Sequence, residues 1–227
     1  MTATTAPTCV GIIMDGNRRF AKERGIPQLE GHRQGYLKMK ETLRWAADVG
    51  IQYVVIYAFS TENWKRPKEE VVYLMDLLRY VLINEVSVLK KEKVRIRCIG
   101  DRAHLDEDLQ GLMQEAEKET ASCTGPTLIL ALSYGGRAEI VSAVNRAIAA
   151  GKPVDEQAFD NLLWTNGVPD PDIIIRTGGE KRLSGFLPWQ GVYSELFFTD
   201  TKWPAFSKEE FFGILNEFSG RKRNFGK

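Results

Sequence analysis

The chain has 227 residues, of which 43% are hydrophobic, so it can bury one full hydrophobic core as a single domain of ordinary size. Its 31 Lys and Arg residues nearly balance 30 Asp and Glu residues, and a formal net charge of +1 argues against non-specific nucleic-acid binding. The three cysteines, Cys9, Cys98 and Cys123, are too few and too irregular for a disulfide framework or a zinc site, which favours a reducing cytoplasm.

The sequence contains no apolar segment long enough to span a membrane. The longest apolar runs, such as residues 53–59, fall far short of the ~20 residues that a membrane span needs. Residues 1–8 lack the charged and apolar regions of a signal peptide. We therefore expect a soluble protein.

The first predicted element is a buried strand at residues 10–14, which ends in Asp15-Gly16-Asn17 before a helix-like segment rich in Arg and Lys. In an open α/β sheet, ligands bind where a strand's carboxyl end meets the amino end of the next helix. Gly16 permits a close backbone approach there, and the helix dipole favours an anion. A carboxylate such as Asp15 suits an anion site if a divalent cation lies between the two. The stretch indicates either a Mg²⁺–diphosphate site, with Arg18 or Arg19 on the phosphates, or an ordinary turn.

The next two elements also place polar residues near strand ends. A helix is expected at residues 34–49, just after Gly31-His32, and a lone His at such a position is more often structural than functional. The second buried strand, residues 53–59, ends in the polar loop 60–67. Trp64 and Arg66 are unusual residues for an ordinary surface loop, so this loop is a second candidate for binding.

Residues 69–93 have the apolar spacing of one long helix. Its main apolar face carries Val71, Leu74, Met75, Leu78 and Leu82. Further apolar residues widen this face beyond what a single core contact requires. Three interpretations are open at this point: a helix buried on two sides, a helix in a dimer interface, or one wall of an apolar tunnel.

The rest of the chain alternates between strands and helices. Strands are predicted at residues 94–99, 127–132, 172–176 and 194–199, and helices at residues 106–120, 138–150, 155–163 and 207–218. This alternation predicts one α/β domain with a mostly parallel, six-stranded central sheet flanked by helices. No glycine-rich nucleotide motif and no hydrolase nucleophile motif is present.

Polar side chains follow three of the predicted strands, and parallel pairing would bring them to one edge of the sheet. They are Asp15, Asn17 and Arg19; Ser60, Asn63 and Arg66; and Arg176, Arg182 and Ser184. Guanidinium groups match phosphate oxygens, and two separate Arg clusters would suit two diphosphates. With the wide apolar helix face, this predicts an enzyme that handles anionic head groups with apolar tails.

Five motifs in this order resemble those of the cis-prenyltransferase family, most closely its undecaprenyl diphosphate synthase branch. They are residues 14–22, 31–32, 59–67, 134–137 and 175–184. The resemblance extends from Val10 to Gly226. It implies a homodimer with that family's α/β fold and apolar tunnel, and Mg²⁺ as the metal. It also implies the condensation of isopentenyl diphosphate with an allylic diphosphate primer, which gives new cis double bonds.

The resemblance also implies roles for individual residues. Asp15 would be the catalytic residue that handles Mg²⁺-diphosphate, with Glu195 as a second acidic residue at the metal. The allylic diphosphate would lie on Gly16, Asn17, Arg18, Arg19, Phe20, Gln28 and His32. A loop that closes over the substrate would contain Ser60, Thr61, Glu62, Asn63, Trp64 and Arg66. Isopentenyl diphosphate would lie on Arg176, Arg182, Leu183 and Ser184.

Asn63, with Ser60 nearby, matches the family's candidate for assisting proton removal. An amide is a poor base in water, so Asn63 more plausibly orients the substrate, and the departing diphosphate could take the proton. Two positions depart from the family pattern: Gln28 and Asn224 stand where many members have arginines. These departures bear on affinity and chain length more than on the type of reaction.

The alternative function is that of a non-catalytic, prenyl-diphosphate-binding accessory subunit. Such partners typically lose the motifs around Asp15 and residues 60–66, and both motifs are intact here. We further expect residues 1–8 to be disordered and residues 219–227 to form a tail that reaches the partner subunit. The expected location is the cytoplasm, with transient membrane contact during product release.

Overall fold

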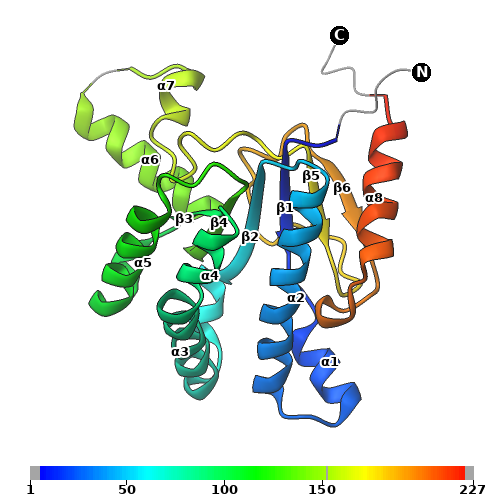
Figure 1. Ribbon diagram of the computed structural model, residues 1–227. Coiled ribbons are helices and arrows are strands. Elements are labelled where there is room, and N and C mark those ends of the chain that lie inside the picture. The colour runs from blue at the N-terminus through cyan, green and yellow to red at the C-terminus, as the bar shows by residue number, and fades with distance from the viewer. Residues whose placement is uncertain (1–5, 152, 223–227) are drawn as a thin grey trace.

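A six-stranded, entirely parallel sheet forms the centre of the computed structural model, which describes residues 6–151 and 153–222 (Figure 1). The strand order is β3-β4-β2-β1-β5-β6, and every neighbouring pair is parallel. The strands are β1 (Cys9–Ile13), β2 (Tyr53–Ser60), β3 (Arg95–Ile99), β4 (Thr127–Tyr134), β5 (Ile173–Arg176) and β6 (Glu195–Phe198). The predicted single parallel sheet of six strands is therefore confirmed.

Eight α-helices lie within the described residues. They are α1 (Asn17–Arg24), α2 (Gln28–Asp48), α3 (Lys68–Asn84), α4 (Val86–Lys91), α5 (Glu107–Thr120), α6 (Gly136–Ala150), α7 (Glu156–Asp160) and α8 (Lys208–Gly220). Buried side chains of α2, α3, α4, α5 and α8 pack with the sheet in the larger core, so these helices cover one face (Figure 1). Phe186, Leu187 and Trp164, from loop segments, pack in the smaller core on the other face. Covering on both faces explains why β1 is buried and apolar along its whole length.

Helix α2 begins at Gln28, six residues before the expected start, because Gly31 and Gly35 do not break it. A Cβ atom at Gly31 would collide with the carbonyl oxygen of Asn17, and one at Gly35 would collide with the Asn17 side chain. The two glycines therefore let α1 pack closely against α2. As a result, Gln28 and His32 lie in the first turns of α2, beside α1.

The single long helix predicted for residues 69–93 is wrong in one respect. The chain forms two helices, α3 and α4, with a break at Glu85. The Glu85 carboxylate lies 2.6 Å from the Lys40 ammonium of α2. The turn also allows Val86 and Leu89 of α4 to be buried in the core. An apolar spacing that continues through a short break cannot reveal such a turn.

The expected disorder of residues 1–8 does not extend to Thr8. Its backbone N–H donates to the Asp172 carboxylate at 2.7 Å, and its carbonyl accepts from the N–H groups of Gln52 and Tyr53 at 3.0 Å. Residues 1–5 and 223–227 lie outside the described residues, and so do Asn224 and most of the predicted tail. In the part of the chain that the structure describes, no helix is both long and apolar enough to cross a membrane.

Candidate active site

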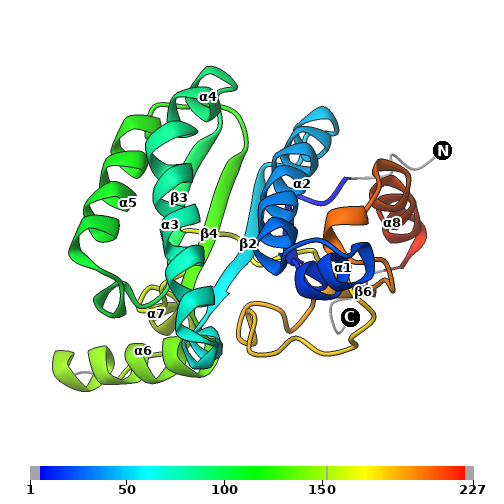
Figure 2. The same ribbon diagram turned by 90° about the horizontal axis from the view of Figure 1, so that it is seen from below.

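A cavity of about 1080 Å³ is lined by residues at the carboxyl ends of β1, β2 and β5, by α1 and by the start of α2. Figure 2 shows α1 beside α2 in the ribbon. The parallel strands converge at this edge of the sheet, so loops that are distant in the sequence meet here. Predicted site residues that line the cavity are Asp15, Gly16, Asn17, Arg18, Arg19, Gln28, His32, Ser60, Thr61, Glu62, Asn63, Arg66, Arg176 and Ser184. Most of the polar residues predicted to converge therefore do so.

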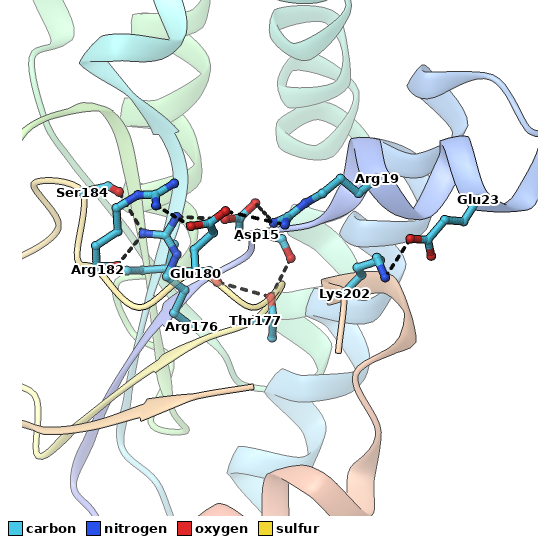
Figure 3. A network of polar contacts seen from close by, with 10 residues as sticks. Asp15, Arg19, Glu23, Arg176, Thr177, Glu180, Arg182, Ser184 and Lys202 are labelled. Carbon is cyan, nitrogen blue, oxygen red and sulfur yellow. Dashed lines mark hydrogen bonds and ion pairs between the residues drawn. The ribbon is translucent and has the colours of Figure 1, made fainter. Parts of the chain in front are cut away.

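Asp15 lies between two arginines that come from different elements (Figure 3). One carboxylate oxygen accepts a hydrogen bond from the Arg176 guanidinium at 2.8 Å, and the other lies 3.1 Å from the Arg19 guanidinium. Arg19 belongs to α1 and Arg176 ends β5. The Asp15 side chain is 29% exposed, so its carboxylate is accessible from the cavity.

Arg176 is the most enclosed charge of this group, with 5% of its side chain exposed. Besides Asp15, its guanidinium donates to the Ser184 hydroxyl at 2.8 Å and to the backbone carbonyl of Arg182. These bonds fix the loop after β5 against the end of β1. The Arg182 side chain instead pairs with Glu180, which also lies 3.8 Å from Arg19.

Asp15, Arg19, Arg176, Glu180 and Arg182 thus form an alternating network in which three cations outnumber two anions (Figure 3). Such an excess of positive charge at the cavity edge favours an anionic ligand.

Five predicted residues do not line the cavity: Phe20, Trp64, Arg182, Leu183 and Glu195. Phe20 is buried, and the Arg24 guanidinium lies 5.2 Å from the centre of its ring. Trp64 packs edge-on against Phe59 and donates its indole N–H to the Ser133 hydroxyl at 3.0 Å. Leu183 packs against the smaller core. Within this chain, Phe20, Trp64 and Leu183 therefore pack behind the residues that line the cavity.

Glu195 lies away from Asp15 within one chain, and its role at the metal stays a prediction. It pairs in register with Ile173, at the start of β5, whereas Ile13, two residues before Asp15, pairs with Arg176 at the end of β5. Three residues of a strand span about 10 Å, so Glu195 lies toward the opposite edge of the sheet from Asp15. Its carboxylate pairs with Arg221, just after α8. One chain therefore does not bring Glu195 and Asp15 to the same metal.

Glu70 was not singled out from the sequence, yet it forms a second charged cluster beside the cavity. Only 4% of its side chain is exposed. One carboxylate oxygen accepts from the Arg66 guanidinium at 3.1 Å and lies 3.2 Å from His32 Nε2, while Arg18 lies 3.8 Å from the other oxygen. Burial lowers the pKa of His32, and the nearby Glu70 carboxylate offsets part of that shift. The four-residue spacing from Arg66 was the one local signal for this pair.

The loop after β2 is held by its own polar groups. The Asn63 side-chain oxygen accepts from the Ser60 backbone N–H at 3.1 Å, which starts the 3₁₀ turn Thr61–Lys65. With this oxygen occupied, Asn63 is better placed to orient a ligand through its NH₂ group than to accept a proton. The neighbouring motif 134–137 adds Arg137 to the cavity wall, and no ion pair joins its guanidinium to another described residue.

A metal at this site would need ligands beyond the protein. In residues 6–151 and 153–222, no group of three or more His, Cys, Asp and Glu side chains could hold a metal ion. Mg²⁺ in proteins is commonly held by one or two carboxylates together with substrate phosphates. The accessible Asp15 carboxylate, which lies between two arginines, fits that mode of binding.

The chain is similar to known proteins along nearly its whole length. The family model for undecaprenyl diphosphate synthases matches residues 13–226. The isoprenyl transferase of Thermotoga maritima is 45% identical, and the alignment covers 97% of each chain. That of Agrobacterium fabrum is also 45% identical, over 99% of this chain and 94% of the relative.

Two solved structures share the fold. Lavandulyl diphosphate synthase from Lavandula x intermedia, in complex with dimethylallyl diphosphate, is 35% identical with a TM-score of 0.93. That comparison covers 98% of this chain and 99% of the other. A probable undecaprenyl diphosphate synthase from Campylobacter jejuni is 34% identical with a TM-score of 0.84, covering 98% and 100% of the two chains.

Proposed function

The chain belongs to the undecaprenyl diphosphate synthase family of prenyltransferases, and from this premise we propose that it condenses isopentenyl diphosphate with an allylic diphosphate primer. The reaction releases diphosphate and adds an isoprene unit with a cis double bond. The observation that supports the proposal is that two arginine–carboxylate clusters contribute arginines to the wall of one cavity. One is centred on Asp15 and the other on Glu70. Each has more guanidinium groups than carboxylates, as two separate diphosphate sites require.

The allylic diphosphate is assigned to the start of α1, with Arg18, Arg19 and His32. Helix α1 has no side-chain hydrogen bond at its amino end, so its first N–H groups can donate to an anion. Isopentenyl diphosphate is assigned to Arg176 and Ser184, across Asp15 from Arg19. This arrangement would place the two reacting carbons in the cavity between the clusters.

In the proposed reaction, the allylic C–O bond breaks and its electrons leave with diphosphate. The double bond of isopentenyl diphosphate attacks the allylic carbon, and a proton is then lost from the new unit. Arg18 and Arg19 would stabilise the negative charge that develops on the leaving diphosphate. Asn63 would orient the substrate, and the departing diphosphate could accept the proton.

Asp15 is the residue that would hold Mg²⁺. When bound, this ion would neutralise part of the diphosphate charge and polarise the breaking C–O bond. Each Asp15 oxygen contacts one arginine in the structure and retains a further lone pair for a metal ion. The two guanidinium groups have further N–H donors that would be available to phosphate.

The proposal is tested by measuring diphosphate release with each substrate alone and with both together, with and without Mg²⁺. Release is expected only when both substrates and the metal are present. The accessory-subunit alternative instead predicts that the protein binds prenyl diphosphate without releasing diphosphate. That alternative is not favoured, because the similarity to isoprenyl transferases covers the chain and the motifs around Asp15 and residues 60–66 are intact.

We also propose a homodimer that uses the region beside β6. Strand β6 has a sheet partner on one side only, and Val192 and Tyr193, just before it, are 70% and 64% exposed. An exposed apolar cluster at a sheet edge favours association with another chain. Sedimentation equilibrium is expected to give a dimer at micromolar concentration, and Val192→Asp is expected to shift it toward monomer. A monomeric parent protein would contradict this.

Gln28→Arg is expected to lower the KM for the allylic primer about 5–30-fold, because a charge-assisted hydrogen bond replaces a neutral one. Gln28 lines the cavity at the start of α2. The KM for isopentenyl diphosphate should change little. Gln34→Arg, on the same helix but outside the cavity lining, is the control. If both KM values stayed the same or moved together, the assignment of the two phosphate sites would be wrong.

Leu74→Phe is expected to shorten the product, whereas Leu82→Phe should not. Leu74 lines the cavity, but Leu82 is buried in the larger core. Overpacking at Leu82 should instead cost about 1–3 kcal/mol of stability. Product chain length and melting temperature, measured for both variants, separate the two effects. The tunnel along α3 remains a prediction, and unchanged product length for Leu74→Phe would count against it.

A further inference from the structure

Glu70 joins three separate elements that surround the cavity. It lies in the first turn of α3 and contacts His32 of α2, Arg66 of the loop after β2, and Arg18 of α1. All three partners line the cavity, although Glu70 itself does not. The carboxylate therefore lies directly behind a set of cationic side chains that face a ligand space.

The bonding of Glu70 is uneven. One oxygen has both close partners, His32 and Arg66. The other oxygen is buried without a hydrogen bond, and the nearest Arg18 nitrogen is 3.8 Å away. Buried polar atoms normally have hydrogen-bond partners, so this oxygen calls for an explanation. A shift of Arg18 toward Glu70 would satisfy it.

The charges around Glu70 do not cancel. Arg18 and Arg66 provide two permanent positive charges against one carboxylate. Each guanidinium has five N–H donors; Arg66 donates one hydrogen bond to Glu70, and Arg18 lies beyond hydrogen-bond distance from it. The remaining donors are available to an anion in the cavity.

We propose that Glu70 is a positioning residue for the allylic diphosphate. It holds His32 and Arg66 through close contacts and attracts Arg18 by its charge before the substrate arrives, so binding immobilises fewer side chains and costs less entropy. This inference rests on the proposed function. A purely structural ion pair would affect stability, but it would not distinguish one diphosphate from the other.

Because Arg66 follows the 3₁₀ turn Thr61–Lys65, Glu70 also ties that loop to α3. None of its three partners contacts Arg176 or Ser184 through a hydrogen bond or ion pair in the described residues. Loss of Glu70 should therefore act on the allylic site and spare the isopentenyl diphosphate site.

The test compares Glu70→Ala and Glu70→Gln with Glu69→Ala in the full-length protein. Glu69 is the exposed neighbour in the same turn of α3, with no ion pair among the described residues, so it is a matched control. Four quantities are measured for each variant: the KM of each of the two substrates, the Kd of the allylic diphosphate alone with Mg²⁺ by calorimetry, and the melting temperature.

Glu70→Ala is expected to raise the KM and Kd of the allylic diphosphate by about 10-fold or more, because the arginines lose their common partner. The KM of isopentenyl diphosphate should change by less than about 2-fold. Glu70→Gln should be intermediate, because an amide oxygen can still accept from Arg66. Glu69→Ala should match the parent protein.

An equal rise in both KM values, or an unchanged allylic Kd in folded Glu70→Ala, would overturn the inference. If Glu70→Ala does not fold, the test uses Glu70→Gln instead. A Kd of this variant for the allylic diphosphate equal to that of the parent protein would then overturn the inference. If the parent protein turns over both substrates and the Glu70 variants have the same KM and Kd values as the parent, only this inference is refuted. A parent protein that neither binds nor turns over the allylic diphosphate would refute the proposed function as well.

Discussion

Asp15→Ala is expected to reduce turnover by about 10³-fold or more, which corresponds to ~4 kcal/mol of lost transition-state stabilisation. Asp15 is the carboxylate that contacts both Arg19 and Arg176 at the cavity, and it is the residue proposed to hold Mg²⁺. Its loss would remove the metal ligand and leave the two guanidinium groups without their shared partner.

The fold should survive this change. Arg176 would keep its bonds to the Ser184 hydroxyl and the Arg182 carbonyl. Asp200→Ala is the matched control, because Asp200 is an exposed carboxylate two residues after β6, near the same edge of the sheet. Turnover and melting temperature are measured for both variants. Near-normal turnover of Asp15→Ala with Mg²⁺ would show that the assigned role is wrong.

Arg176→Lys is expected to lower kcat/KM for isopentenyl diphosphate by about 10²-fold or more, equivalent to ~3 kcal/mol. The buried Arg176 guanidinium reaches Asp15 with one nitrogen and Ser184 with another. A Lys ammonium is a point charge on a flexible stem and cannot reproduce this fork. The KM for the allylic primer should change much less, because Arg18 and His32 are untouched.

Arg97→Lys provides the comparison for a structural arginine. Arg97 is partly buried on β3 and donates to the backbone carbonyls of Trp164 and Asn166, outside the cavity. This change should lower the melting temperature and leave both KM values unaltered. If Arg176→Lys behaved in the same way, Arg176 would have a structural role only.

Much of this site was predictable because parallel strands end at a common edge. Apolar runs located the strands, their alternation with helices indicated parallel pairing, and the polar residues after each run then had to converge. Asp15, Arg19 and Arg176 do converge, although Arg176 is 161 residues from Asp15 in the sequence. No local pattern other than the strand ends was needed for that inference.

The sequence patterns failed where packing between elements decides the outcome. Glu70 appeared to be one more acidic residue at the start of an amphipathic helix, and its importance comes from Arg18 and His32 on two other helices. Gly31 precedes the predicted start of the helix at residue 34, but it lies inside α2 and marks a close helix contact. Motif resemblance also does not show where a side chain lies within one subunit, as the placement of Glu195 demonstrates.

The proposed reaction is tested most directly by the incorporation of labelled isopentenyl diphosphate into a lipid-extractable product. The labelled substrate, an allylic primer and Mg²⁺ are incubated with the protein, and the geometry of each new double bond is determined by NMR. We predict one diphosphate released for each isoprene unit added, and new double bonds that are cis. Binding of both substrates without incorporation, or new double bonds that are trans, would contradict the proposal.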